Sequence, residues 1–265
     1  LDRRNRRHEP RRIHRRHRNL IDRVNVAGRF ETRTYTDPET GREYTVANQL
    51  NPGENRWVIT NPKQGQYPIV AFTPRREYAG IELVFNKRFA NGWQLLASYV
   101  YSKSSGSSDN YFWDARSTSL GQSMLFTDPN YQINADGRLS FDPTHMVKLQ
   151  WTVFLPLDVA LSGYFSHISG DTYDRELAVS LAQDLVYILA DGRGHYRLPA
   201  RTNLDLRLEK TLGLGGKRCT LMLDCFNVFN ANTPTAVLTY AGTGFQEAAR
   251  LVNPRIFRAG VRVEF

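Results

Sequence analysis

The densest group of aromatic and polar side chains lies near the middle of the chain. It is the run Asn110-Tyr-Phe-Trp-Asp114, followed by Arg116. Aromatic faces beside hydrogen-bonding groups can stack on and orient a ring, such as that of a sugar or a siderophore. The same side chains can also pack one loop against another. We therefore take these four residues as a candidate substrate-contact loop: Tyr111, Phe112, Trp113 and Arg116.

The other chemically capable side chains lack the spacing that metal binding or catalysis requires. Only two of the six histidines are close together, and no carboxylate is placed to complete a site. Asp171, Asp174 and Glu176 form an acidic cluster, but the regular spacing and the glycine of an EF-hand loop are absent. No Gly-x-Ser-x-Gly nucleophile elbow is present. We expect no catalytic residue, no cofactor, no metal and no enzymatic activity.

The elements that must position these residues are amphipathic strands. Successive strand side chains point to opposite faces, so alternating apolar and polar residues indicate a strand with one face of each kind. Three hairpins and a closing strand show this alternation. An eighth strand is expected around residues 13–30. The seven clear strands span residues 81–89, 93–101, 145–155, 159–167, 201–212, 218–230 and 256–265.

The connections between these strands alternate between short and long. Short turns fall near 90–92, 156–158 and 213–217, whereas long polar segments fill about 31–76, 103–143, 169–200 and 231–254. Structureless connections of that length are unusual in a compact soluble domain. Outer-membrane barrels combine short periplasmic turns with long external loops. Aromatic residues are expected to form girdles at the two ends, with Phe89, Trp93 and Phe265 at the short-turn end.

These patterns predict an all-β fold, an antiparallel transmembrane β-barrel segment of about seven or eight strands. A soluble sheet with one solvated face gives the same alternation in any single strand. The recurrence of this alternation in several hairpins favours the barrel. The mean hydropathy of −0.48 does not detect such strands. No run of about eighteen apolar residues is present, which excludes a transmembrane helix.

The net charge of +9 is concentrated at the start of the chain. Residues 1–18 hold nine arginines against Asp2 and Glu9, which leaves +2 for the other 247 residues. Such an arm could bind nucleic acid or anionic lipid. No aromatic interleaving or recognition fold accompanies it, so we expect a disordered or truncated segment over 1–18, no nucleic-acid partner, and the barrel portion over 19–265.

The two cysteines are expected to remain unpaired. Cys219 and Cys225 are six residues apart in one predicted strand, so about 20 Å separates them at roughly 3.3 Å per residue. A disulfide needs Cα atoms within about 7 Å. No signal peptide opens the sequence, and for an exported barrel this suggests a fragment of a longer protein.

Several of these segments together resemble a known family. Arg201–Leu212, Leu223–Asn230 and Lys87–Trp93, with the closing Asn253-Pro-Arg255 strand, are similar to the C-terminal barrel region of TonB-dependent, Oar-like outer-membrane receptors. The resemblance covers roughly residues 76–265. It implies a large barrel that carries nutrients across the outer membrane, with its lumen closed by a plug. No plug or TonB box is identifiable in the sequence.

The resemblance also implies partners. Outer-membrane lipid would contact the apolar face, and barrel-assembly machinery would recognise Phe265 as the terminal aromatic residue. The TonB energy complex would act only through the plug, and a small-molecule substrate would meet the external loops.

Two other classes of protein remain open. One is a complete eight-stranded outer-membrane barrel with a structural or adhesion role, which needs a good strand before residue 31. The other is a soluble β-protein with a nucleic-acid-binding arm, which would remain in the aqueous phase without detergent.

Overall fold

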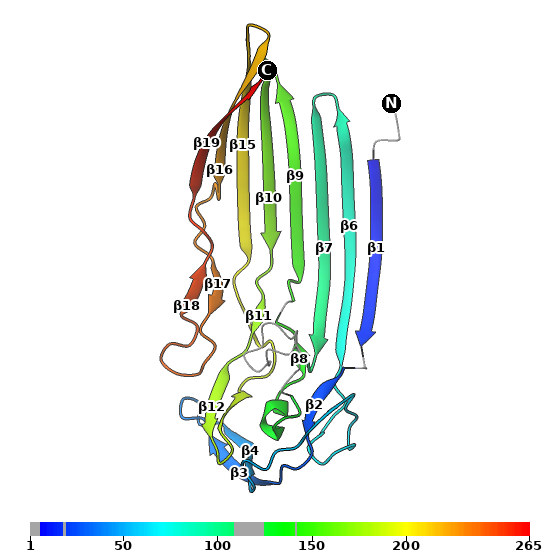
Figure 1. Cartoon of the computed structure of the whole chain (residues 1–265), viewed down its shortest axis with the longest axis vertical. Helices are drawn as coiled ribbons and strands as arrows, with labels where there is room; N and C mark the ends of the chain where they lie inside the picture. Colours follow the sequence, from blue (N-terminus) through cyan, green and yellow to red (C-terminus); the bar gives the residue numbers. More distant parts are fainter. Residues whose placement is uncertain (1–5, 18–19, 109–124, 141) are drawn as a thin grey trace.

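The computed structural model describes residues 6–17, 20–108, 125–140 and 142–265. Its main element is one antiparallel sheet, with the strand order β1-β6-β7-β9-β10-β15-β16-β19 and the short β8 (Gly137–Arg138) paired to β7 (Figure 1). The eight long strands are β1 (Arg6–His17), β6 (Arg76–Ala90), β7 (Trp93–Gly106), β9 (His145–Leu155), β10 (Val159–Ile168), β15 (Arg201–Leu214), β16 (Lys217–Phe226) and β19 (Ile256–Glu264).

The short turns connect consecutive strands at one end of the sheet. Asn91 and Gly92, then Leu157 and Asp158, all have φ between 53° and 79°. Two consecutive residues with positive φ make the two-residue turn whose twist matches that of the flanking strands. The third turn needs only Gly215 and Gly216, so it is shorter than the predicted 213–217 segment.

The seven predicted strands are confirmed, and the eighth lies earlier than expected. It is β1, which pairs in continuous register with β6 from Arg6 opposite Lys87 to His17 opposite Arg76. Most of the predicted 13–30 range instead begins the first long connection. Charged residues did not prevent pairing, because the ladder is formed by backbone groups. The proposed division at residues 18 and 19 stays a prediction.

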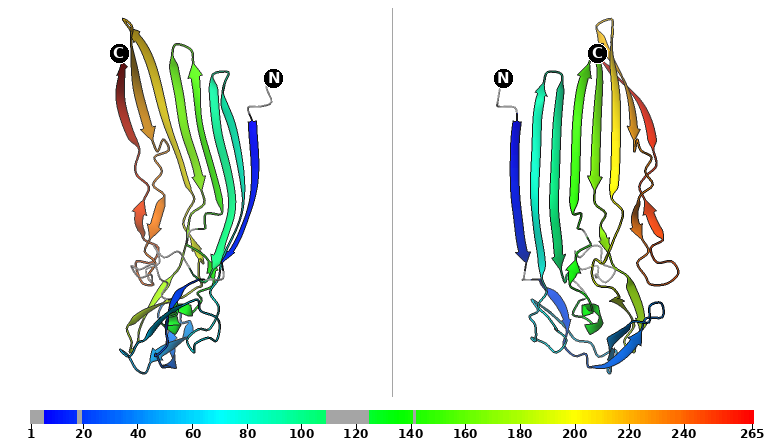
Figure 2. Two further views of the ribbon diagram at one scale, coloured as in Figure 1. Left: turned by 45° about the vertical axis from the view of Figure 1, so that its right-hand side comes forward. Right: turned by 180° about the vertical axis from the view of Figure 1, so that it is seen from behind.

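The sheet is curved and open. N- and C-terminal strands lie at its opposite edges in both views of Figure 2. Within the described residues, no ladder joins β1 to β19. The assembly is therefore one arc of an antiparallel wall.

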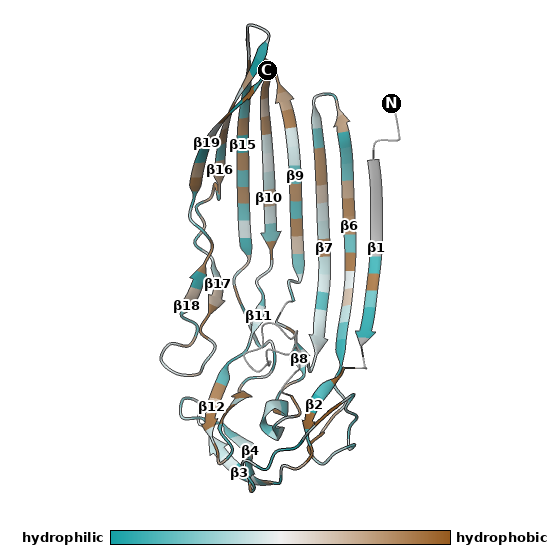
Figure 3. Cartoon of the chain, viewed as in Figure 1, coloured by the Kyte–Doolittle hydropathy of each residue, from teal (hydrophilic) through white to brown (hydrophobic). Residues whose placement is uncertain are grey.

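The two faces of the wall have opposite character. Figure 3 shows hydrophilic and hydrophobic residues alternating along the long strands. On one face, called here the apolar face, side chains with large exposed fractions include Ile81 (47%), Leu223 (49%) and Val261 (64%). The free cysteines Cys219 and Cys225 lie on this face too, since Cys219 pairs opposite Val263 and Cys225 opposite Phe257.

The long connections are folded, contrary to the expectation of structureless loops. They gather beyond the long-loop end of the sheet (Figure 1), and we call this assembly the cap. No helix among the described residues is long and apolar enough to cross a membrane. The cap contains the 3-10 helix η2 (Pro129–Gln132) and five small antiparallel pairs: β2 (Asp22–Asn25) with β5 (Trp57–Thr60), β3 (Phe30–Thr36) with β4 (Glu43–Gln49), β11 (Thr172–Tyr173) with β14 (Tyr196–Arg197), β12 (Glu176–Ser180) with β13 (Leu185–Leu189), and β17 (Pro234–Val237) with β18 (Ala248–Leu251).

Two buried apolar clusters stabilise the cap. One joins β4 to β12 and β13 through Val46, Val179 and Ile188, each at most 2% exposed. The other surrounds Val24 and Phe126, which are fully buried. Residues far apart in sequence thus share cores, because each connection alone is too small to bury its apolar side chains.

One close contact on the apolar face depends on a glycine. Trp151 lies across from Gly163 in the β9–β10 ladder, and its indole covers the glycine. A Cβ atom at Gly163 would come within 2.1 Å of the Trp151 ring. The backbone there has no positive φ to strain, so the requirement for glycine is steric.

We expect Gly163→Val to displace the Trp151 ring and destabilise the sheet by about 1–3 kcal/mol, as overpacking does. Tryptophan fluorescence during urea unfolding in detergent measures the change. Gly260→Ala is the matched control, because its Cβ would meet only the flexible end of Met222, at 3.3 Å. Equal unfolding midpoints for both variants would contradict the packing argument.

Candidate functional site

A continuous row of polar side chains crosses the face of the sheet opposite the apolar one. The ladders place one residue from each of six adjacent strands side by side. A hollow of ≈ 430 Å³ lies along most of this row. We call the whole surface the polar face, and the row consists of Gln94, Thr152, Ser162, Arg207, Asp224 and Arg258.

Three neighbouring pairs in the row are hydrogen-bonded. The Thr152 and Ser162 hydroxyls lie 3.0 Å apart. Arg207 donates from Nε to Asp224 Oδ1 at 2.6 Å, and Arg258 donates from Nε to Asp224 Oδ2 at 2.8 Å. The Asp224 side chain is only 6% exposed, whereas that of Arg258 is 60% exposed. The two guanidiniums satisfy the carboxylate and leave one cationic group accessible from the polar face.

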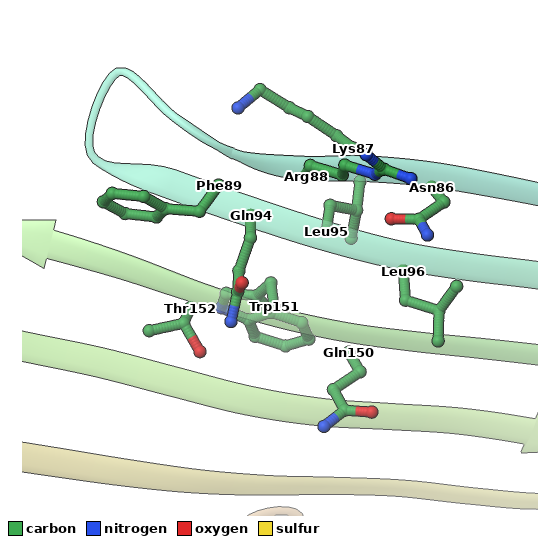
Figure 4. A pocket seen from close by; sticks show the side chains of 10 residues that line it. All are labelled: Asn86, Lys87, Arg88, Phe89, Gln94, Leu95, Leu96, Gln150, Trp151 and Thr152. Atoms are coloured by element: carbon green, nitrogen blue, oxygen red, sulfur yellow. The ribbon is translucent and has the colours of Figure 1, made fainter. Parts of the chain in front are cut away.

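An aromatic pair interrupts the polar face at the short-turn end. A β-bulge between Lys87 and Ala90 sets two residues of β6, Arg88 and Phe89, opposite Gln94 alone. Phe89 therefore lies beside the polar-face residues (Figure 4), and its ring contacts Phe154 edge-on at 5.3 Å. Strict alternation along β6 puts Phe89 on the apolar face with Phe85, and that expectation is wrong because alternation does not anticipate a bulge.

Phe89 also borders a second hollow. This hollow has a volume of ≈ 340 Å³ and is lined by polar residues of β6, β7 and β9 together with Leu95, Leu96 and Trp151. Figure 4 shows Gln94, Gln150 and Thr152 around it. The rings of Phe89 and Phe154 are both more than half exposed, so the polar face offers apolar contact area here as well as hydrogen bonds.

One buried arginine holds the cap together. The Arg175 side chain is 4% exposed and is paired with three carboxylates. It donates to Asp37, to Asp191 Oδ2 at 2.9 Å and to Glu39 Oε2 at 2.9 Å. These pairs join the β3–β4 connection to the β12–β13 region, across 138 positions of sequence.

Arg175 lowers the pKa values of two carboxylates in this cluster. Burial favours a higher pKa for Asp37, but hydrogen bonds from Arg175 and Thr40 outweigh it and lower the pKa to about 2. Burial also opposes ionisation of Asp191, yet bonds from Arg175 and Tyr196 lower its pKa. The pKa of Arg175 is raised, because bonds to Asp37 and Asp191 outweigh the effect of burial. Asp37, Asp191 and Arg175 are therefore ionised at neutral pH.

A second buried carboxylate ties the cap to the sheet. Asp142 Oδ2 accepts from Arg138 at 2.8 Å and from Arg197 at 3.2 Å. Its Oδ1 accepts from the backbone N–H of Ser104, at the end of β7, at 2.6 Å. The carboxylate thereby fixes the position of the 103–143 connection where it leaves the long-loop end.

The predicted substrate-contact residues Tyr111, Phe112, Trp113 and Arg116 lie outside the described residues. The described residues on either side are buried, since Ser108 is 5% exposed and Leu125 is 4% exposed. The terminal aromatic Phe265 follows β19, with its ring 93% exposed and Lys217 Nζ 4.4 Å from its centroid.

The acidic cluster predicted from sequence is divided among different contacts. Asp171 pairs with Arg201 at 3.4 Å, and Asp174 accepts from the backbone N–H of Gly194. The Glu176 backbone bonds to Thr239. In the part of the chain that the structure describes, no group of three or more His, Cys, Asp or Glu side chains could hold a metal ion. These three residues thus organise the cap.

Arg175 and Asp142 were not found by sequence reasoning. Each is a single charged residue in a polar segment, and no local spacing relates it to its partners. Arg175 meets Asp37 only after the two connections fold together. A pattern search has no signal for such a pair.

Comparison with known proteins agrees with this architecture. A family model described as an outer membrane beta barrel domain matches residues 14–171. The TonB-dependent transporter Oar of Myxococcus xanthus is 26% identical over 191 residues, covering 66% of this chain and 17% of that protein. The chain thus spans about a sixth of the length of this relative.

A solved structure shows the same kind of sheet. The outer membrane transporter YddB from Escherichia coli superposes with a TM-score of 0.51 at 14% identity, over 96% of this chain and 30% of that one. The ferric preacinetobactin receptor BauA from Acinetobacter baumannii gives a TM-score of 0.46 at 15% identity, over 89% of this chain and 26% of that one.

We expect Arg175→Met to loosen the cap while leaving the sheet intact. Removing the cation leaves the buried Asp37 carboxylate without its charged partner, which costs about 3–5 kcal/mol for a broken buried pair. Hydrogen–deuterium exchange should accelerate in β3, β4, β12 and β13, with the β9–β10 ladder unchanged.

Arg33→Met is the matched control, because the Arg33–Glu31 pair is exposed and worth at most about 1 kcal/mol. Equal exchange in the two variants would show that the Arg175 cluster does not hold the cap.

Proposed function

The chain belongs to the outer membrane beta barrel domain family, and on that premise we propose that it forms part of the wall of a TonB-dependent receptor for nutrient uptake. The observation that carries the proposal is the polar row across six strands, opposite an exposed apolar face. In a transmembrane barrel the apolar face contacts lipid and the polar face lines the interior. The soluble alternative with a nucleic-acid arm is overturned by the outer-membrane family match.

The wall would be completed by further strands. The sheet is open, and the chain spans 17% of Oar and 30% of YddB. A transporter barrel of about 22 strands with a plugged lumen has room for an arc of this size. In such a barrel the polar face would contact the plug, and the plug would connect the receptor to the TonB energy complex.

Substrate capture is assigned to the cap. The Arg175 and Asp142 clusters hold the long connections in defined positions at the external end, which favours recognition because less conformational entropy is lost on binding. Tyr111, Phe112, Trp113 and Arg116 supply the stacking and hydrogen-bonding groups suited to a siderophore or an oligosaccharide. Phe265, exposed at the periplasmic end, is proposed as the contact for barrel-assembly machinery.

A complete eight-stranded barrel is the second candidate, because the sheet has eight long strands. Closure would place β1 beside β19. Within a larger barrel those two strands lie apart.

Paired cysteines distinguish the two barrel sizes. In a Cys219→Ser, Cys225→Ser background, Arg12→Cys is combined in turn with Phe257→Cys, Ala259→Cys and Val261→Cys. We expect no disulfide after oxidation of outer membranes, because cysteines bridge only across about 7 Å or less. Ile81→Cys with Tyr101→Cys, which are opposite each other in the β6–β7 ladder, is the positive control. Efficient bridging of β1 to β19 would establish the small barrel instead.

Uptake is tested with a strain lacking the gene. Growth on a panel of ferric siderophores and oligosaccharides identifies the compound that depends on the protein. We expect Trp113→Ala to lower uptake of that compound about tenfold, since an aromatic contact contributes roughly 0.5–1.5 kcal/mol beyond its buried area.

Trp57→Ala, at an exposed tryptophan of the cap, is the control and should retain uptake. The uptake proposal is wrong if no compound in the panel depends on the gene.

A further inference from the structure

The apolar face ends in basic residues at its long-loop end. In the ladders Arg12 lies opposite Ile81, which lies opposite Tyr101. Two residues further along, His14 lies opposite Ala79, which lies opposite Lys103. Residues opposite each other in a ladder share a face, so these side chains continue the lipid-facing surface. We call the following four exposed residues the outer basic patch: Arg12, His14, Arg16 and Lys103.

The charges of the patch are only partly compensated. Arg16 Nε pairs with Glu77 at 2.7 Å, and Glu77 also meets Arg75 at 3.5 Å. Neither Arg12 nor Lys103 makes an ion pair with any described residue. The two therefore present cationic groups that protein carboxylates do not satisfy.

The patch lies at the depth of lipid headgroups. Tyr101 and Tyr99 form an aromatic group with His145, whose Nδ1 is 2.9 Å from the Tyr99 hydroxyl. From Trp93 at the opposite end to Tyr101 is about 27 Å along the strand, or roughly 21 Å along the membrane normal at a usual tilt of about 40°. The apolar band of such barrels is about 25 Å tall. With Trp93 at the inner edge of this band, Arg12 lies about 4 Å inside the outer edge, from which its long side chain reaches the headgroups. His14 and Lys103 lie at the outer edge itself.

We propose that the outer basic patch binds the phosphorylated headgroup of a lipid in the outer leaflet. Arginine engages phosphate through two parallel hydrogen bonds and lysine binds it as a point charge. His14 and Lys103 flank the small Ala79 at about 10 Å from each other, two strand spacings apart, which leaves room for a phosphate between longer side chains. The lipid acyl chains would lie against Ile81 and its exposed apolar neighbours.

The position of the patch favours a lipid headgroup over other anions as its ligand. It lies on the face that hydrocarbon covers, so a nucleic acid would have to displace lipid to reach it. A substrate in the lumen or under the cap would meet the polar face instead. The inference depends on the outer-membrane location and not on transport, so failure of uptake would leave it standing.

The test measures lipid retained by the protein extracted from outer membranes in detergent. Native mass spectrometry is used to titrate diphosphorylated lipid A, with phosphatidylcholine, a zwitterionic lipid of zero net charge, as the comparison. Each basic residue near an anionic surface strengthens association about fivefold. We expect the R12Q/R16Q/K103Q variant to bind lipid A at least about tenfold more weakly, with phosphatidylcholine binding unchanged.

Two controls make the result specific. K87Q/K210Q/K217Q removes three charges at the short-turn end and should keep wild-type affinity, whereas R12K/R16K preserves charge and should keep most of it. Gel mobility that shifts on boiling verifies that each variant is folded, and K103Q alone replaces the triple variant if that variant misfolds. Equal loss in patch and short-turn variants would overturn the proposal. So would full displacement of lipid A by inorganic phosphate, which would indicate a simple anion site.

Discussion

The constraint on which the whole architecture depends is that hydrocarbon offers no hydrogen-bond partners to a peptide backbone. Every N–H and C=O group at membrane depth must therefore be paired inside the protein. The continuous antiparallel ladders from β1 to β19 meet this demand for all strands between the two edges. The same demand applies to the outer edges of β1 and β19. Both edges must therefore pair, either with further strands, as proposed, or with each other. Charged residues can occupy β1 because the backbone alone makes the ladder.

The ladder also determines which side chains meet. Once the register is set, Arg207 and Arg258 must flank Asp224, and Arg12 and Lys103 must share the face of Ile81. The polar row, the aromatic pair at the short-turn end and the outer basic patch thus follow from one set of pairings. The bulge at Lys87–Ala90 is the exception that moves Phe89 to the polar face.

The cap obeys a different rule. Outside the membrane, water can satisfy loop backbones, so the long connections need another reason to take one arrangement. Two apolar clusters and the buried Arg175 provide it. Separating the Arg175 guanidinium from its carboxylates would cost several kcal/mol. The arrangement in which all of these groups meet is therefore favoured. The long-loop end therefore combines long connections with a fixed geometry.

The amino-acid sequence by itself determined the seven amphipathic strands, their turns, their two faces and the outer-membrane family, because a period of two residues and a positive-φ turn are local signals. Only the tertiary structure decided that Arg6–His17 is a strand, that Phe89 changes face and that the long connections fold into a cap. Pairing of β1 depends on the exposed edge of β6, and the bulge depends on the register of β6 and β7. The Arg175 cluster depends on residues 138 positions apart. Each of these is a relation between distant segments, and alternation along one segment carries no information about it.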